Sequence, residues 1–435
     1  MIEFFRITFR YFFVFYIIYF LWQGITYIKI ERKKLSLSNV PIIKQKITII
    51  FIQVKAIFLL SDGFSNFTII LIGFLWICIF IFHSFAIIKI YKTACQLIWN
   101  GLFFLLCIGN IILTRLDYSL ALRQLLWLFI AVLLTLFLPL IIKLLPKLEK
   151  LEYLYLSFGI LLLLSTFIIG TEEFGSIRWI RIGGFGFSPA EIVGFTYILY
   201  IATAFRKKIN FIKTIFPTAM AFFHVVILVA LRNLGGALIF FVAYIIIMYV
   251  STGNKFLLLS SIFSFSIGSF FAYRIFNHVA IRVSVWLNPW YNAFGIGFQI
   301  VQSLFAIGTW GIWGSGLGLG LPSHVPVVAR DLTFAAITEE FGIIFAMGII
   351  GVYIMIFYRG VHIALRCRRR YYSLLSVGFT SVLAFQTFLI IGGTINLIPL
   401  TGVTLPFISY GGSSLLISII MISMLQWIFI NNENL

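Results

Sequence analysis

The chain has 435 residues, of which 62% are hydrophobic and only 10% are charged, and its mean hydropathy is +1.09. This composition excludes a soluble globular fold, because so few polar side chains cannot cover a water-exposed surface. The net charge of +19 would suit nucleic acid, but the basic residues lie in short groups between apolar segments. That distribution favours anionic membrane lipids as partners and no nucleic acid.

Apolar runs of about 20 residues, the length that crosses a hydrocarbon core, recur along the chain and predict an all-α polytopic membrane protein. The runs lack the alternation of a barrel strand, so helices are favoured. Glu3, followed by a long apolar stretch without a small-residue cleavage site, favours a retained first span over a cleaved signal. We expect twelve spans, at residues 11–29, 67–89, 97–114, 119–142, 153–170, 188–205, 214–231, 236–252, 256–276, 334–358, 371–394 and 406–430.

Residues 1–90 are expected to form an appended N-terminal transmembrane unit of two helices, followed by a membrane domain at residues 91–435. The linker between the two helices, residues 30–66, carries six basic residues, Arg32, Lys33, Lys34, Lys44, Lys46 and Lys55. Its apolar part, residues 47–60, is interrupted by Lys55. We leave open whether this part spans the membrane or lies in the interface as an amphipathic helix.

The positive-inside rule predicts the topology of the membrane domain. If residues 89–96 are cytoplasmic, the C-terminus is also cytoplasmic and the loop 277–333 is extracellular. The basic residues that then fall inside are Lys143, Lys147, Lys150, Arg206, Lys207, Lys208, Lys213, Lys255, Arg359, Arg366, Arg368, Arg369 and Arg370. The linker 30–66 is the exception, because the same phase puts its basic residues outside.

The segment GSIRWIRIGGFGFSPAE at 175–191 predicts an interfacial hairpin that leads into a helix. Arg178 and Arg181 bracket Trp179, an aromatic residue typical of the headgroup level, and Ser188 precedes a proline, as a helix N-cap does. Two arginines at a membrane surface can bind a phosphate group bidentately. Contact with lipid headgroups explains them equally well.

The loop 277–333 is the longest polar interruption, and Asp331 lies near its end, directly before an apolar run. A carboxylate at this boundary is either a helix N-terminal charge, worth about 0.5 kcal/mol through the backbone dipole, or a group with a chemical role. The sequence leaves both interpretations open. Glu339 and Glu340 follow in the same run and point about 100° apart, so we expect one of them to pair with an arginine or a backbone group.

Two glycine-containing segments, at 308–320 and 406–414, are not nucleotide phosphate loops, because neither follows a strand or carries the Lys-Ser/Thr pair. We expect their glycines to permit tight turns and close helix approach. The four cysteines have no metal-ligand spacing and are interpreted as small apolar fillers, so no metal site is predicted. They are Cys78, Cys95, Cys107 and Cys367.

Together these motifs resemble the SEDS family of bacterial envelope proteins (shape, elongation, division and sporulation), which includes FtsW, RodA and SpoVE. The resemblance covers about residues 97–430, and seven segments occur in family order. They are RQLLW at 123–127, GSIRWIRIGGFGFSPAE at 175–191, LGGAL at 234–238, WLNPW at 286–290, GFQIVQSLFAIGTWGIWGSGLGLG at 297–320, DLTFAAITEEFG at 331–342 and PLTGVTLPFISYGGSS at 399–414.

The resemblance implies a bundle of ten membrane helices, to which the N-terminal unit would add about two, as in a Gram-positive branch of the family. It implies a peptidoglycan glycosyltransferase of the bacterial plasma membrane, acting in cell division, elongation or sporulation. Its substrate would be lipid II, the undecaprenyl-pyrophosphoryl disaccharide-pentapeptide, polymerised into glycan strands at the outer face. The implied partner is a class B penicillin-binding protein, the transpeptidase that crosslinks the product.

The resemblance also implies roles for single residues. Asp331 stands at the place of the family's essential aspartate and would be the general base that takes a proton from the acceptor's sugar hydroxyl. Arg178, Arg181, Arg330 and Arg282 are candidates to offset charge on the departing phosphates. Substrate-binding roles are also expected for Glu191, Gln299, Gln302 and Ser409. No cofactor is indicated, although Mg²⁺ or Mn²⁺ held mostly by substrate phosphates would leave no spacing in the sequence.

The chain departs from the family pattern at two places. Val328, Ala329 and Arg330 precede Asp331 where a carboxylate and a histidine are common, and Asn233 replaces an aspartate. We expect Arg330 to favour the ionised form of Asp331 and so to lower its pKa.

Two alternatives come from other functional classes. A lipid II flippase would need alternating access, charges at the midplane and usually internal repeats. A noncatalytic divisome scaffold would leave Asp331 dispensable.

Overall fold

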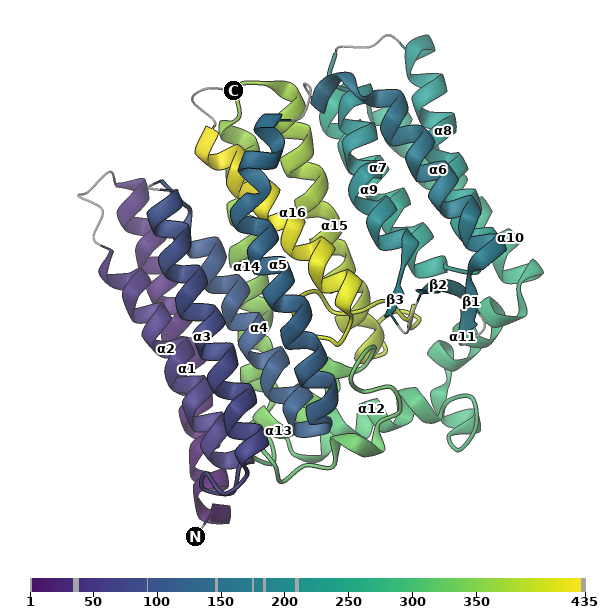
Figure 1. Cartoon of the computed structure of the whole chain (residues 1–435). Coiled ribbons are helices and arrows are strands. Elements are labelled where there is room, and N and C mark those ends of the chain that lie inside the picture. Colours follow the sequence, from purple (N-terminus) through teal and green to yellow (C-terminus); the bar gives the residue numbers. More distant parts are fainter. Residues whose placement is uncertain are drawn as a thin grey trace.

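The computed structural model describes residues 2–33, 39–91, 93–144, 148–173, 176–182, 185–207 and 211–431. It is a bundle of long helices with a small antiparallel sheet at one end (Figure 1). The helices are α1 (Ile2–Arg32), α2 (Val40–Leu60), α3 (Phe67–Ile90), α4 (Gln96–Leu116), α5 (Tyr118–Leu144), α6 (Glu152–Ile169), α7 (Pro189–Ala204), α8 (Phe211–Ala230), α9 (Leu234–Thr252), α10 (Lys255–Ile275), α11 (Asn277–Leu287), α12 (Phe298–Thr309), α13 (Thr333–Phe341), α14 (Ile343–Arg366), α15 (Arg370–Thr394) and α16 (Gly412–Asn431).

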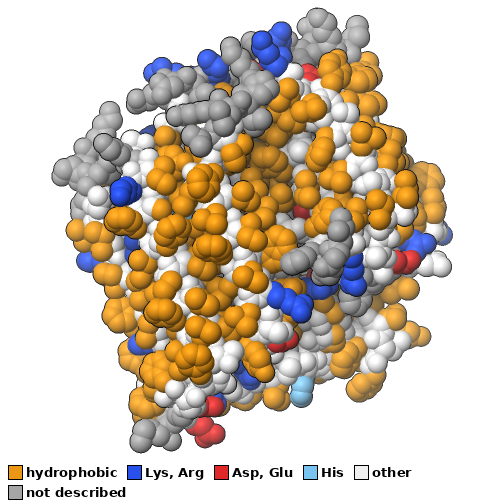
Figure 2. Space-filling view, viewed as in Figure 1, with side chains coloured by type: hydrophobic (Ala, Val, Ile, Leu, Met, Phe, Trp, Pro, Cys, Tyr) orange, Lys and Arg blue, Asp and Glu red, His pale blue; other side chains and the backbone are white. Residues whose placement is uncertain are grey.

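Within the described ranges, ten helices are long and apolar enough to cross a membrane, which confirms an all-α polytopic membrane protein. They are α1, α3, α4, α5, α6, α9, α10, α14, α15 and α16. The other two expected spans correspond to α7 and to the apolar part of α8, Thr214–Ala230, which are shorter apolar helices. On the face in Figure 2, hydrophobic side chains cover the middle of the bundle, while Lys and Arg lie mainly toward its ends.

The N-terminal unit contains three helices rather than the expected two, because residues 40–60 form α2, which packs against α1 and α4. Lysines interrupt the apolar pattern of this helix in the sequence, but two of them have partners in the fold. The Lys55 Nζ lies 4.0 Å from the ring centroid of Phe12, with the rings of Phe9 and Tyr16 within 5 Å. The Lys46 Nζ donates to the side-chain oxygen of Gln96 at 3.2 Å.

Helix α2 also explains the basic linker. It returns the chain along α1, so Arg32 and Lys33 lie at the same end of the bundle as the α14–α15 turn and the end of α16 (Figure 1). We call this the basic end, and its described members include Arg206, Lys207, Lys255, Arg366, Arg368, Arg369 and Arg370. Most of the expected linker therefore runs through the bundle as α2 instead of forming a loop at one end. Lys34, Lys147 and Lys208 lie outside the described residues.

The N-terminal unit is joined to the rest of the bundle through buried polar contacts. On α4, where every residue from Leu97 to Thr114 is buried, Asn100 donates to the side-chain oxygen of Gln45 on α2 at 3.1 Å. On α14, Arg359 pairs with Glu31 of α1 at 2.5 Å and donates to the Cys95 Sγ at 3.1 Å. The buried Arg359 side chain thus links α14 to α1 through an ion pair.

The opposite end, which we call the site end, contains the sheet and the segment 277–333 (Figure 1). Strands β1 (Thr171–Glu173), β2 (Ser176–Ile182) and β3 (Phe185–Phe187) pair antiparallel, in agreement with the predicted hairpin. The segment 277–333 includes α11, α12 and short 3₁₀ turns at Pro289–Asn292 and Pro322–His324. The expected span 334–358 is divided at Gly342, whose φ of +85° and lack of side-chain space end α13 before α14 begins.

Candidate functional site

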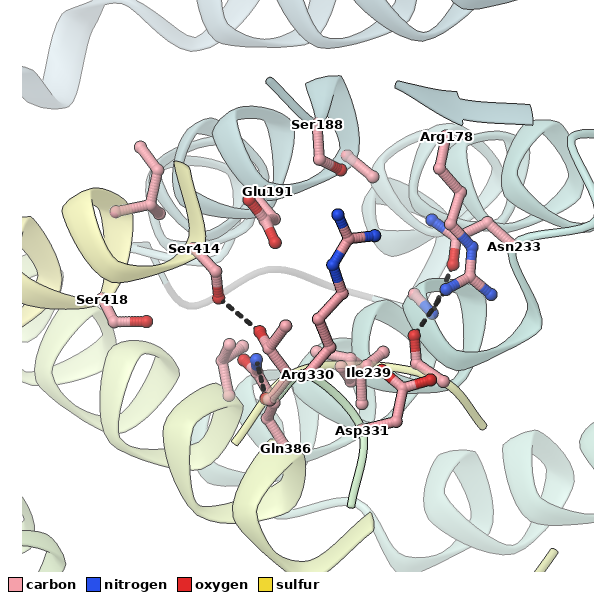
Figure 3. A pocket seen from close by; sticks show the side chains of 18 of the residues that line it. Arg178, Ser188, Glu191, Asn233, Ile239, Arg330, Asp331, Gln386, Ser414 and Ser418 are labelled. Carbon is pink, nitrogen blue, oxygen red and sulfur yellow. Dashed lines mark hydrogen bonds between the residues drawn. The ribbon is translucent and has the colours of Figure 1, made fainter. Parts of the chain in front are cut away.

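A cavity of about 1120 Å³, its open mouth included, lies at the site end between β2, α7, α9, α11, α15 and α16. Five of the nine site residues expected from the sequence line this cavity, and they come from four separate parts of the chain (Figure 3). They are Arg178, Glu191, Arg282, Arg330 and Asp331. Apolar side chains line the cavity as well, among them Ile239, Phe240, Val382, Ile417 and Met421.

Asp331 is positioned by a tight turn that starts at Val327. The backbone N–H groups of Arg330 and Asp331 donate to the Val327 carbonyl at 3.0 and 3.1 Å. Val327 has a φ of +54°, a conformation that costs free energy for a β-branched residue. The turn is fastened to the loop 399–411 because the Tyr410 N–H donates to the carbonyl of Ala329 at 2.8 Å. The position of Asp331 therefore depends on two loops that are far apart in sequence.

Gly402 marks the point where the charged groups converge. Arg178 donates to the Gly402 carbonyl at 2.5 Å, and Arg282 donates to the Leu400 carbonyl at 2.9 Å. A Cβ on Gly402 would lie 3.4 Å from the Asp331 Oδ2, 3.5 Å from the Arg178 Nη1 and 3.7 Å from the Arg282 Nη2. Backbone carbonyls thus hold two guanidinium groups beside the Asp331 carboxylate.

Burial and charge act in opposite directions on Asp331. Burial raises the pKa of Asp331 above its ordinary value, and the positive charges of Arg178, Arg282 and Arg330 lower it by less. As expected, the charge of Arg330 lowers the pKa of Asp331, but burial raises this pKa by more. Burial also lowers the pKa of Arg178 to about 10, so Arg178 remains a cation at neutral pH. Asp331 is therefore a stronger base than an exposed aspartate. The neighbouring Arg178 keeps its positive charge at neutral pH.

Asp331 lies two residues before the start of α13, so its alternative role as a charge near the helix N-terminus stays a prediction beside its place in the cavity wall. Helix α13 begins at Thr333 and has no side-chain capping hydrogen bond. The Thr333 Oγ1 instead contacts the Ser409 Oγ at 2.9 Å and donates to the Val328 carbonyl at 2.9 Å. The start of α13 is thus fixed by Thr333, and the Asp331 carboxylate lies in the cavity wall (Figure 3).

Arg330 extends into the cavity toward Ser188 and Glu191 (Figure 3). Its guanidinium lies 5.7 Å from the ring centroid of Trp179, an interaction that orients the side chain. Trp179, expected at the headgroup level, is part of the cavity lining. A cation directed into a cavity next to Asp331 can bind an anionic group of a ligand.

Glu191 is the second carboxylate of the cavity. It lies in the first turn of α7 and accepts a hydrogen bond from the Ser413 Oγ at 2.5 Å. Nearby, the hydroxyls of Thr404 and Ser414 are 2.7 Å apart, and the side-chain nitrogen of Gln386 donates to the Thr404 carbonyl at 2.9 Å. Three residues of the cavity were not expected from the sequence, namely Gln386, Thr404 and Gly402. A lone amide within the apolar run 371–394 was the available signal for Gln386.

Four expected site residues do not line the cavity, and their roles in substrate binding stay predictions. Arg181 is exposed on β2, and Gln299 and Gln302 are half-buried on α12. Ser409 is buried, and its hydroxyl accepts a hydrogen bond from the Leu405 N–H at 3.1 Å while also contacting Thr333. In this structure, Ser409 supports the segment that carries Asp331.

Asn233 lies at the N-terminus of α9 and lines the cavity. Its side-chain oxygen accepts a hydrogen bond from the Gly236 N–H at 3.1 Å, which caps the helix. An aspartate would make the same cap, so this departure from the family pattern preserves the local structure. The described part of the chain contains no group of three or more His, Cys, Asp or Glu placed to hold a metal ion.

The fold and the site define a membrane-embedded protein with two carboxylates and three arginines in a cavity that apolar side chains also line. A family model described as cell cycle protein, of the FtsW, RodA and SpoVE type, matches residues 91–434, and the chain belongs to this family. The resemblance expected from the sequence motifs is thereby confirmed.

Named relatives match about three fifths of the chain. The peptidoglycan glycosyltransferase RodA of Mycobacterium tuberculosis is 34% identical over 271 residues, which cover 59% of this chain and 58% of that protein. The chain thus matches less than two thirds of the length of this relative. Stage V sporulation protein E of Bacillus subtilis is 33% identical over 269 residues, which cover 59% of this chain and 72% of that protein.

Solved structures share the fold. A chain from a study of how a peptidoglycan synthase complex coordinates polymerization and crosslinking has a TM-score of 0.66 and 23% identity, with 79% of this chain and 99% of that chain covered. The rod shape determining protein RodA of Thermus thermophilus has a TM-score of 0.57 and 23% identity, with coverage of 78% and 98%.

Proposed function

We propose that the protein is a peptidoglycan glycosyltransferase that polymerises lipid II into glycan strands. The observation that carries the proposal is the Asp331 carboxylate beside the guanidinium groups of Arg178 and Arg282 in a cavity that apolar side chains also line. A lipid-linked pyrophosphate sugar matches these three features. Its hydroxyl can lose a proton to the carboxylate, its phosphates can bind the guanidinium groups, and its apolar chain can contact the apolar side chains. The names of the family members above support the same activity.

In the proposed reaction, the 4-hydroxyl oxygen of the acceptor sugar attacks the anomeric carbon of the donor. The bond between that carbon and the pyrophosphate oxygen breaks, and undecaprenyl pyrophosphate leaves with the bonding electron pair. Asp331 accepts the hydroxyl proton, for which its raised pKa suits it. Arg178, Arg282 and Arg330 offset the negative charge that grows on the leaving phosphates.

We also propose the membrane orientation and the partner. The site end faces outward and the basic end faces the cytoplasm, where anionic headgroups attract its Lys and Arg side chains. A class B penicillin-binding protein crosslinks the product, by analogy with the peptidoglycan synthase complex of the similar fold. Helices α1 to α3 precede the region matched by the family model, and we assign them as an addition of the Gram-positive type.

The test is reconstitution of the full chain with its transpeptidase in vesicles that contain labelled lipid II. We expect glycan polymer, detected by gel electrophoresis, together with release of undecaprenyl pyrophosphate. The rival function, lipid II transport, predicts movement of the label across the bilayer without polymer. Transport without polymer, or neither product, would overturn the proposal.

A further inference from the structure

The first turns of α1 contact a glycine-rich loop, residues 314–320, at the site end. Arg10 donates from Nη1 to the Gly314 carbonyl at 3.1 Å. The loop approaches α1 so closely that a Cβ on Gly316 would lie 2.8 Å from the Arg6 carbonyl oxygen. Gly314 and Gly316 have φ values of +73° and +100°, a conformation that glycine adopts without strain. The loop sequence therefore fits contact with a helix that precedes the family region.

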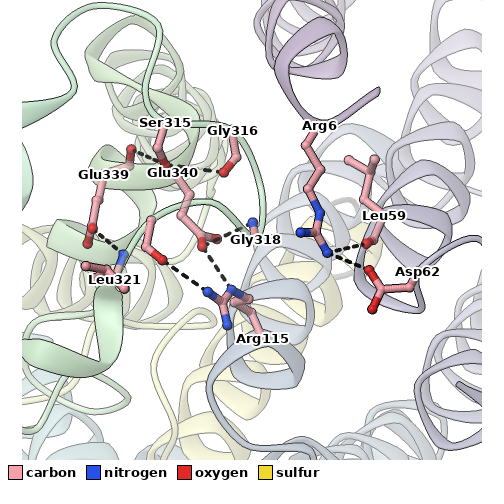
Figure 4. Close-up of polar contacts among 11 residues, drawn as sticks. Arg6, Leu59, Asp62, Arg115, Ser315, Gly316, Gly318, Leu321, Glu339 and Glu340 are labelled. Atoms are coloured by element: carbon pink, nitrogen blue, oxygen red, sulfur yellow. Dashed lines mark hydrogen bonds and ion pairs between the residues drawn. The ribbon is translucent and has the colours of Figure 1, made fainter. Parts of the chain in front are cut away.

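The α1 side of this contact is itself fixed. Arg6 pairs with Asp62, in the turn between α2 and α3, at 2.7 Å, and also donates to the Leu59 carbonyl (Figure 4). Tyr11 accepts a hydrogen bond from Arg10 at 2.8 Å, and its ring meets that of Trp313 edge to face, with centroids 5.0 Å apart. Other residues of the N-terminal unit thus hold Arg6 and Arg10 in place where α1 meets the loop.

The other side of the glycine-rich loop is held by α13. Glu340, which is fully buried, pairs with Arg115 at 3.0 Å and accepts a hydrogen bond from the Gly318 N–H at 3.2 Å (Figure 4). The Glu339 side chain accepts a hydrogen bond from the Leu321 N–H at 2.6 Å. We expected one of the two glutamates to pair with an arginine or a backbone group, and both do so. The loop consequently bridges α1 and α13.

We propose that Arg10 is a positioning residue for Asp331, acting through the glycine-rich loop and α13. Helix α13 begins two residues after Asp331, and its first residue, Thr333, is bonded to the Asp331 turn and to Ser409. A displacement of α13 would therefore be passed through Thr333 to the Asp331 turn and to the loop 399–411 that is bonded to it. The consequence for catalysis rests on the proposed function, whereas the mechanical coupling does not.

The experiment compares Arg10→Met, Arg10→Lys and the wild type as full chains reconstituted with the transpeptidase and lipid II. For Arg10→Met we expect kcat to fall about tenfold, since small misplacement of a reacting group is costly, with KM changed less than about twofold. Arg10→Lys should recover most of the loss, because it again offers a cation to the Gly314 carbonyl. The matched control is Arg32→Met, on the same helix at the basic end, where Arg32 donates to the Tyr358 hydroxyl at 2.7 Å.

Amide hydrogen exchange supplies a readout that does not need activity. Arg10→Met should speed exchange both in residues 313–321 and in residues 326–334. Unchanged kcat, faster exchange confined to 313–321, or an equal loss in Arg32→Met would overturn the proposal. If Arg10→Met does not fold, Tyr11→Ala, at a half-exposed site, tests the same contact. A wild type without polymer would defeat the proposed function, while the exchange measurement would still decide the coupling.

Discussion

At the residue scale, the balance of burial and charge at Asp331 determines how activity should depend on pH. A general base works in its ionised form, and burial raises the pKa of Asp331. As pH falls, activity should therefore be lost at a higher pH than for an exposed aspartate. Arg282→Gln removes a positive charge that lowers this pKa, so the loss of activity in acid should begin at a still higher pH. The profile of kcat/KM against pH measures both effects, and an upward shift that is absent or reversed would contradict them.

A second residue-scale prediction concerns Asn233. Its side chain caps α9, so Asn233→Ala should lower the free energy of unfolding by about 1 kcal/mol. Asn233→Asp restores the residue type common in the family and keeps the cap, so it should not destabilise the protein. Thermal unfolding in detergent measures the difference. Equal stability of the alanine and aspartate variants would show that the cap is unimportant.

At the element scale, the loop 399–411 holds the charged groups together at Gly402. Gly402→Ala would introduce strain at a φ of +70°, costing about 1 kcal/mol, and a Cβ beside Asp331, Arg178 and Arg282. We expect turnover to fall far more than stability. The matched control is Gly253→Ala, which has a φ of +65° and nothing within 4 Å of the added Cβ. Similar turnover in both alanine variants would mean that Gly402 matters only for backbone strain.

Elements also show what could be predicted from the sequence. Ten spans follow from hydropathy because each is a continuous apolar run. The sequence left open whether residues 47–60 span the membrane or lie in the interface, because no local pattern reveals the aromatic rings of α1 that contact Lys55. The division between α13 and α14 depends on the tertiary position of Gly342. Motif resemblance found Asp331 and its arginines, but the supporting roles of Gly402 and Ser409 depend on contacts between distant loops.

At the scale of the whole molecule, a buried ion pair joins the N-terminal unit to the family region. Glu31→Gln should destabilise the protein by about 3 kcal/mol, because the Arg359 side chain, only 2% exposed, would keep its charge without a full partner. Adding Arg359→Met should recover part of this loss. The control is Glu172→Gln in the exposed pair with Arg232, which should have no measurable effect. Equal effects of the two glutamate substitutions in chemical unfolding would argue against a structural role for the buried pair.

In the proposed chemistry a single carboxylate, Asp331, accepts the proton of the attacking hydroxyl. The turnover of Asp331→Asn in reconstituted vesicles therefore tests the proposal most directly. Asparagine preserves the shape of the side chain but cannot accept the proton, and we expect polymer formation to fall by at least about a hundredfold while lipid II binding and thermal stability remain. Asp117→Asn, at an exposed aspartate whose side chain accepts a hydrogen bond from the Ser119 N–H, should polymerise lipid II like the wild type. Polymer made by Asp331→Asn at the wild-type rate would contradict the assignment of Asp331 as the base.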